Sequence, residues 1–193
     1  MKRVTAGSRY RLIIIGVVVL LAGLTYLFLR GPGFWQRSYY PLEYRAYIAE
    51  SAARHEVNPY LVAAVINTES SWDPDAKSDA GAVGLMQLLS RSAGDLARWG
   101  IVDGEKYPVS DLSDPRVNIE YGTAYLRYLV ERYHEIEPAL AAYNGGLGNA
   151  DKWVEAGDDV RETIEFPETR AFVLKVVRAK ENYERLYPDA FER

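Results

Sequence analysis

The stretch NTESSWDPDAKSDAGAVGLMQLLS, residues 67–90, places a carboxylate and a glycine-bearing loop directly after an apolar segment. Asn58–Pro59 is a typical helix start, because Asn caps free backbone N–H groups and Pro has no N–H to leave unsatisfied. In the helix that follows, the spacing places Val62, Ile66 and Glu69 on one face. Glu69 therefore either faces the apolar interior or flanks the helix end in water, and periodicity alone favours water.

The two environments predict different chemistry for Glu69. Removal from water disfavours the charged form of a carboxyl group and raises its pKa. A buried Glu can therefore stay protonated near neutral pH and act as a general acid. A Glu in water would only flank the helix terminus.

The rest of the chain after residue 41 also has helical spacing, without sustained two-residue alternation. Asp114–Pro115 repeats the start signal and opens a long amphipathic pattern. Further helical segments are expected at 42–57, 138–144, 149–157 and 168–187. The sequence therefore predicts one mainly α-helical domain over residues 42–190.

Residues 12–29 contain no charged side chain. As a helix of 18 residues, this stretch would be about 27 Å long, which is close to the thickness of a bilayer's hydrocarbon core. We expect a single-pass transmembrane helix over 12–29, a basic N-terminus over 1–11 and a linker over 30–41. The apolar run is longer than that of a signal peptide and no small-x-small site follows it, which favours an uncleaved anchor.

Basic residues are unequally distributed around this apolar segment. Four of them precede it and only Arg30 follows closely, so the positive-inside rule predicts a cytoplasmic N-terminus in the cell membrane. The helical domain is then expected outside the cytoplasm, in the periplasm or on the cell-wall side.

Composition excludes several classes of function. The chain has no cysteine, which excludes disulfides, thiol catalysis and Cys-based zinc sites. His55 and His134 have no partners at metal-ligand spacing, so we expect neither a metal nor another cofactor. Residues 31–193 contain 18 basic and 27 acidic residues, a formal charge of −9. This charge argues against nucleic acid as a partner and is compatible with a neutral, sugar-like ligand.

Four ordered blocks carry a resemblance to a known family. They are Glu69-Ser70, SDAGAVGLMQL at 78–88, ALAAYNGGLGNADKW at 139–153 and FPETRAFVLKV at 166–176. With these blocks the chain resembles the soluble-lytic-transglycosylase-like (SLT domain) family, bacterial peptidoglycan-cleaving enzymes with a goose-lysozyme-like fold. The resemblance implies a lysozyme-like helical domain.

The resemblance also implies roles for individual residues. Glu69 matches the single catalytic acid of the family, and Tyr143 matches the tyrosine near the scissile bond. The substrate-binding residues implied in this way are Ser78, Met86, Gln87, Tyr143 and Asn144. Leu89-Ser90 departs from the family's usual Met-Pro, which leaves the detail of that wall of the sugar groove open. We expect Trp72, Trp99 and Trp153 to be packing residues.

The reaction implied by the resemblance is lytic transglycosylation. Glu69 would first protonate the β-1,4 bond between N-acetylmuramic acid and N-acetylglucosamine, and then act as a base to form a 1,6-anhydromuramyl product. A hydrolytic lysozyme on the same fold is one alternative. A catalytically silent, membrane-tethered glycan-binding scaffold is another. The expected partners are peptidoglycan glycan strands and the cytoplasmic membrane.

Overall fold

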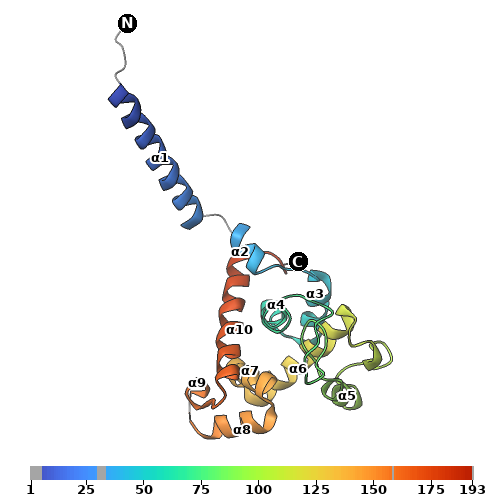
Figure 1. Ribbon diagram of the computed structural model, residues 1–193. Helices are drawn as coiled ribbons and strands as arrows, with labels where there is room; N and C mark the ends of the chain where they lie inside the picture. Colours follow the sequence, from blue (N-terminus) through green and yellow to red (C-terminus); the bar gives the residue numbers. More distant parts are fainter. Residues whose placement is uncertain (1–5, 30–33, 158, 193) are drawn as a thin grey trace. The chain divides into compact units, whose positions relative to one another are not determined.

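The computed structural model describes residues 6–29, 34–157 and 159–192. It contains two compact units, Met1–Tyr39 and Tyr40–Arg193 (Figure 1). The predicted basic N-terminus and linker lie partly outside the described residues, at 1–5 and 30–33.

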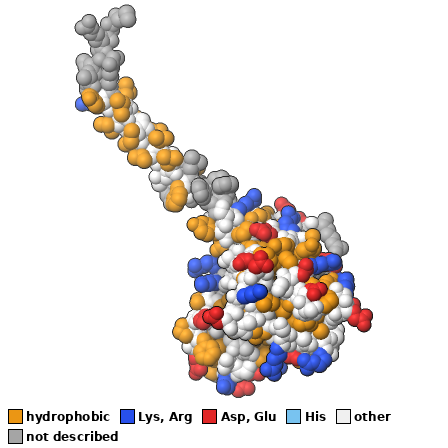
Figure 2. Space-filling model, turned by 45° about the vertical axis from the view of Figure 1, so that its right-hand side comes forward, with side chains coloured by type: hydrophobic (Ala, Val, Ile, Leu, Met, Phe, Trp, Pro, Cys, Tyr) orange, Lys and Arg blue, Asp and Glu red, His pale blue; other side chains and the backbone are white. Residues whose placement is uncertain are grey.

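The first unit consists of α1 (Ala6–Leu29) and α2 (Phe34–Tyr39), a short helix inside the predicted linker. Apolar side chains surround α1, and many of them are more than half exposed (Figure 2). Within the part of the chain that the structure describes, however, no helix has both the length and the apolarity of a membrane span. The predicted transmembrane helix over 12–29 is therefore not confirmed.

The second unit is mainly α-helical, as predicted. Its α-helices are α3 (Arg45–His55), α4 (Pro59–Glu69), α5 (Ser90–Arg98), α6 (Pro115–Tyr133), α7 (Ile136–Gly145), α8 (Leu147–Glu155), α9 (Val160–Thr163) and α10 (Pro167–Leu186). A short 3-10 helix, η1 (Val109–Asp111), precedes α6. The side chains of Asn58 and Asp114 accept backbone N–H groups at the starts of α4 and α6, which confirms both predicted helix starts.

Helix α4 is buried along most of its length and carries Glu69 at its end. All six residues from Leu61 to Ile66 are buried, and α4 packs against α3, α6 and α10 (Figure 1). A helix that is apolar on every side is stable only inside a core. The core therefore fixes the axis of α4, and with it the position at which the helix presents Glu69.

The chain turns sharply after Glu69, and this turn is anchored to α10. Ser71 and Trp72 both have left-handed backbones, with φ of 53° and 69°, a conformation that residues other than glycine rarely adopt. The indole N–H of Trp72 donates to the hydroxyl of Tyr183 at 2.9 Å and to Oδ1 of Asn67 at 3.2 Å. These bonds hold the end of α4 against α10.

Asn118 of α6 holds the loop that follows this turn. Its side chain is fully buried and makes three hydrogen bonds to backbone groups. Oδ1 accepts the N–H of Met86 at 2.8 Å, while Nδ2 donates to the carbonyls of Val83 at 2.9 Å and Leu112 at 2.8 Å. A buried amide bonded in this way is a rigid support, because moving it leaves unpaired polar groups.

His55 belongs to a structural ion cluster between α3 and α6. Its Nε2 lies 2.9 Å from Oε1 of Glu120, and Arg54 donates to Oε2 of the same carboxylate at 2.5 Å. Burial opposes ionisation of Glu120, but the hydrogen bonds from His55 and Arg54 outweigh it and lower the pKa of Glu120 to about 2. The cluster therefore joins the two helices through charge-assisted bonds.

Candidate functional site

Glu69 is the last residue of α4 and is partly buried. Among the described residues, no side chain or backbone group forms a hydrogen bond or ion pair with its carboxyl. Burial, followed by the nearby carboxylate of Glu168, raises the pKa of Glu69 to about 7. A carboxyl group in this environment holds a proton near neutral pH and can give it to a ligand.

Tyr143 of α7 stands close to Glu69. Burial raises its pKa well above the ordinary value, and the negative charge of Glu69 adds to this effect. Its hydroxyl donates to the carbonyl oxygen of Met86 at 2.7 Å. Its ring packs between those of Tyr125, with centroids 5.4 Å apart, and Phe172, at 6.3 Å. The phenol is thus fixed in both position and orientation.

Met86 and Gln87 support this arrangement from the loop. The side chain of Met86 is fully buried and lies against α6, where a Cβ added at Gly122 would come within 2.2 Å of its sulfur. Gln87 has a left-handed backbone with φ of 46°. Its Nε2 donates to the carbonyls of Ala76 at 3.1 Å and Gly84 at 3.0 Å. Met86 therefore contributes its backbone carbonyl oxygen to the site, where it accepts the hydroxyl of Tyr143. The side-chain amide of Gln87 stabilises the loop by bonding to its backbone.

Ser78 and Asn144 are exposed. Oγ of Ser78 accepts the N–H of Ala82 at 3.0 Å, while Oδ1 of Asn144 accepts the hydroxyl of Thr169 at 2.8 Å. Among the described residues, neither side chain forms a hydrogen bond with Glu69. Of the residues predicted from sequence, the structure therefore brings together Glu69, Tyr143 and the Met86 carbonyl.

Two important residues were not identified from sequence. Asn118 could have been noticed as an amide among the apolar positions of α6, next to Val117 and Tyr121. Glu168 lies in the motif FPETR, which carries no sign of a role beside Glu69. Its proximity to Glu69 comes from the packing of α10 on α4. Sequence spacing gives no signal for that proximity.

One prediction about the tryptophans is wrong. Trp72 and Trp153 are buried, with 4 % and 3 % of their surface exposed, as expected for packing residues. Trp99, in contrast, is 54 % exposed. It follows the last residue of α5, where its backbone caps the helix, and its half-exposed ring lies against that of Tyr128, with centroids 5.5 Å apart.

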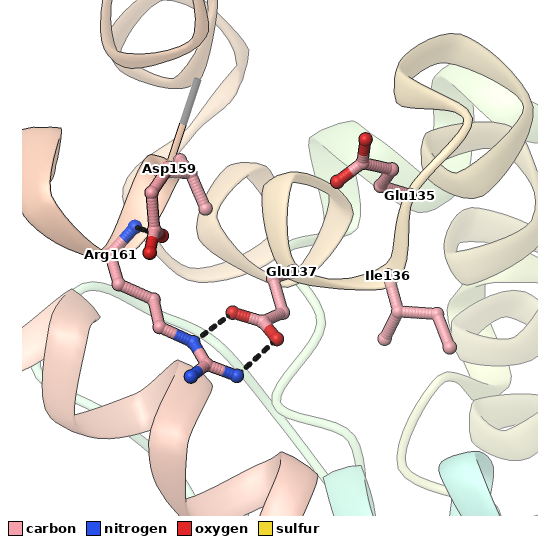
Figure 3. A pocket seen from close by; sticks show the side chains of 6 residues that line it. Glu135, Ile136, Glu137, Asp159 and Arg161 are labelled. Atoms are coloured by element: carbon pink, nitrogen blue, oxygen red, sulfur yellow. Dashed lines mark hydrogen bonds and ion pairs between the residues drawn. The ribbon is translucent and has the colours of Figure 1, made fainter. Parts of the chain in front are cut away.

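A pocket of about 470 Å³ lies elsewhere, between the start of α7 and α9. Figure 3 shows Glu135, Ile136, Glu137, Asp159 and Arg161 around it, with Arg161 paired to Glu137. None of the predicted site residues lines this pocket. In the described ranges, no group of three or more His, Cys, Asp or Glu side chains is arranged to hold a metal ion.

Comparison with protein families gives a match to one domain. The Transglycosylase SLT domain matches residues 46–165, a range that includes Glu69, the loop up to Gln87, and Tyr143.

Individual relatives match the same part of the chain. The soluble lytic murein transglycosylase of Escherichia coli K12 is 34 % identical over 145 residues, covering 72 % of this chain and 22 % of that protein. Membrane-bound lytic murein transglycosylase C of Yersinia pestis (strain Pestoides F) is 35 % identical over 169 residues, covering 74 % and 47 %. The chain thus spans from about a fifth to about half of the length of these relatives.

Solved structures agree with the sequence matches. The 70 kDa soluble lytic transglycosylase of Escherichia coli superposes with a TM-score of 0.70 at 31 % identity, covering 76 % of this chain and 25 % of that one. An inactive mutant of the lytic transglycosylase Slt from Pseudomonas aeruginosa, in which Gln replaces a Glu, gives 0.69 at 30 % identity, covering 76 % and 24 %. The helical domain therefore has the fold of these enzymes.

Proposed function

Because the chain belongs to the Transglycosylase SLT domain family, we propose that it is a lytic transglycosylase that cleaves peptidoglycan. Its substrate is the β-1,4 bond between N-acetylmuramic acid and N-acetylglucosamine. The observation that carries the proposal is the carboxyl of Glu69, which is partly buried, has a pKa of about 7 and lies beside Tyr143. A proton donor of this kind is what cleavage of a glycosidic bond requires first.

In this mechanism, Glu69 acts twice. It first gives its proton to the glycosidic oxygen, so that the bond to C1 of the muramyl residue breaks and the N-acetylglucosamine hydroxyl leaves. The acetamido group of the muramyl residue stabilises the positive charge at C1. The Glu69 carboxylate then takes the proton of the C6 hydroxyl, whose oxygen bonds to C1 and forms the 1,6-anhydro ring. The carboxyl ends protonated, as it began, and no water is consumed.

Ser78, Gln87 and Asn144 belong to the proposed binding surface, together with Tyr143 and the backbone of Met86. The hydroxyl of Ser78 and the Nδ2 of Asn144 can donate to sugar hydroxyl and acetamido groups. Gln87 can offer only its Oε1 as an acceptor, because its Nε2 already donates to the carbonyls of Ala76 and Gly84. The partly exposed ring of Tyr143 offers an apolar contact to the sugar.

Hydrolysis is the second candidate, and Glu168 is the observation that favours it. Ordinary glycosidases use two carboxyl groups, one as acid and the other as base or nucleophile. Glu168 is exposed and close enough to Glu69 to raise its pKa, so it could activate a water molecule. The transglycosylase mechanism, in contrast, uses Glu69 alone and needs no second carboxyl group.

Mass spectrometry of purified sacculi digested by the full chain tests the proposal. We expect muropeptides with the 1,6-anhydro ring, each lighter by one water than the corresponding hydrolysis product. Products that carry the additional water would replace the proposal with a lysozyme. If no fragments are released, the chain is not an active enzyme under these conditions, and the catalytically silent glycan-binding scaffold becomes the better interpretation.

We also propose that residues 12–29 attach the domain to the cytoplasmic membrane, with the basic N-terminal residues on the cytoplasmic side. The exposed apolar side chains of α1 and the charge-free sequence support this proposal. The full chain should stay with membranes after an alkaline carbonate wash, whereas a variant with Leu20→Arg and Leu21→Arg should be released. Recovery of the unmodified chain in the wash would rule out this attachment.

A further inference from the structure

The starting observation is the exposed indole at the end of α5. Trp99 is 54 % exposed, although tryptophan is on average one of the more buried residues. Its backbone is right-handed, and its N–H donates to the carbonyl of Asp95 at 2.9 Å, while Gly100 takes the left-handed position that follows. Any residue could fill the position of Trp99, so the fold itself does not require an indole there.

Trp99 is the first of a continuous row of aromatic rings that ends beside Glu69. Its ring centroid lies 5.5 Å from that of Tyr128, which lies 6.4 Å from Tyr125 with the planes 11° apart. Tyr125 in turn lies 5.4 Å from Tyr143. Tyr125 and Tyr128 are three residues apart on α6 and are both partly exposed, so they share one face of the helix. We call Trp99, Tyr128, Tyr125 and Tyr143 the aromatic row.

The aromatic row also offers polar groups. Among the described residues, no hydrogen bond involves the indole N–H of Trp99 or the hydroxyls of Tyr125 and Tyr128. Each of these side chains therefore combines a ring face with a free polar group. A pyranose ring has the matching chemistry, because its axial C–H groups are attracted to the negative face of an aromatic ring and its hydroxyls can meet the polar groups.

We propose that Trp99 and Tyr128 bind an outer segment of the glycan strand, several sugars away from the bond at Glu69. This inference rests on the proposed function, since it takes the strand to be bound at Glu69. A sugar polymer seated at Tyr143 continues over the neighbouring surface, and the aromatic row is continuous with that surface. This continuity favours a glycan over a protein partner.

The test compares substrates of two lengths with the full chain. Replacing Trp99 with Ala should lower kcat/KM about tenfold on long glycan strands, the effect of losing one aromatic contact. It should leave turnover unchanged on a fragment too short to extend beyond the sites next to Glu69. Trp99→Phe keeps a ring and should recover most of the activity. Tyr47→Ala removes a 39 % exposed aromatic side chain from α3 and is the matched control.

Binding provides a second readout that does not depend on turnover. In the Glu69→Gln background, Trp99→Ala should weaken binding of long β-1,4-linked N-acetylglucosamine oligomers and leave binding of short ones unchanged. Equal losses for both lengths, or no loss for long ones, would overturn the inference. The inference would also be overturned if Trp99→Ala changed only the amount of protein found in the membrane fraction and left glycan binding and cleavage unchanged.

The two proposals fail in different ways. If the unmodified chain releases no anhydro product but Trp99→Ala still weakens binding of long oligomers, the proposed function fails and the outer glycan site remains. If the unmodified chain is active and Trp99→Ala matches it on long strands in both assays, the outer site alone is wrong.

Discussion

Replacing Glu69 with Gln should lower the release of anhydromuropeptides by about 10³-fold or more, the range expected when a positioned general acid and base is lost. Gln has nearly the same shape but carries no transferable proton. Because the carboxyl of Glu69 has no described hydrogen-bond partner, the substitution should leave the free energy of unfolding unchanged or slightly higher. Product analysis of digested sacculi and urea denaturation measure the two effects. Retained turnover in the Gln variant would remove Glu69 from the mechanism.

Glu168→Gln is the matched control, because it changes a neighbouring carboxyl in the same way. The Glu168 charge raises the pKa of Glu69, so its removal should lower that pKa below about 7. Activity requires protonated Glu69 at the start of the reaction, and it falls as pH rises through the pKa. The alkaline limb of the kcat/KM profile should therefore move to lower pH, while activity at acidic pH stays close to that of the unmodified chain. Loss of activity at every pH would instead identify Glu168 as a base and favour hydrolysis.

Replacing Gly84 with Ala should destabilise the domain by about 2–5 kcal/mol, the sum of a left-handed backbone cost and an overpacking cost. Gly84 has a φ of 76°, and a Cβ there would lie 2.4 Å from Nδ2 of Asn118. Asn118 cannot move aside without losing its bonds to the loop and to Leu112. The displaced loop would also shift the Met86 carbonyl, so activity should fall in the fraction that still folds. Urea denaturation and the sacculus assay measure both effects.

Gly81→Ala separates the two causes of this destabilisation. Gly81 also has a left-handed backbone, with a φ of 84°, but a Cβ there would meet no atom within 4 Å. Its substitution should cost only about 1–2 kcal/mol, from the backbone alone. Equal costs at Gly81 and Gly84 would show that the contact with Asn118 does not limit the loop.

Local signals allowed the helices to be predicted, and their absence explains what was missed. Asn58 and Asp114 cap helices through bonds to residues that follow directly, so the sequence alone contains the information. The loop after Glu69 depends instead on Asn118, more than 30 residues away, and on left-handed backbones at Ser71 and Trp72. No glycine marks those two positions.

In the candidate site, too, some residues could be predicted from local motifs and others depend on how distant helices pack. The motifs predicted Glu69 and Tyr143, and the charge of Glu69 contributes to raising the pKa of Tyr143. The effect of Glu168 on Glu69 depends on how α10 packs against α4, which spacing within one helix cannot reveal. Trp99 was predicted to be a packing residue, and it is more than half exposed.

The hydrogen bond from Tyr143 to the Met86 carbonyl limits what this tyrosine can recognise. A phenol has one hydrogen to give, and here it is already engaged, which leaves only oxygen lone pairs for a bound molecule. The atom that meets this oxygen must therefore bring its own hydrogen, as an alcohol or an amide N–H does. A ketone or carboxylate in the same place would find two acceptors facing each other, and such a ligand would be rejected.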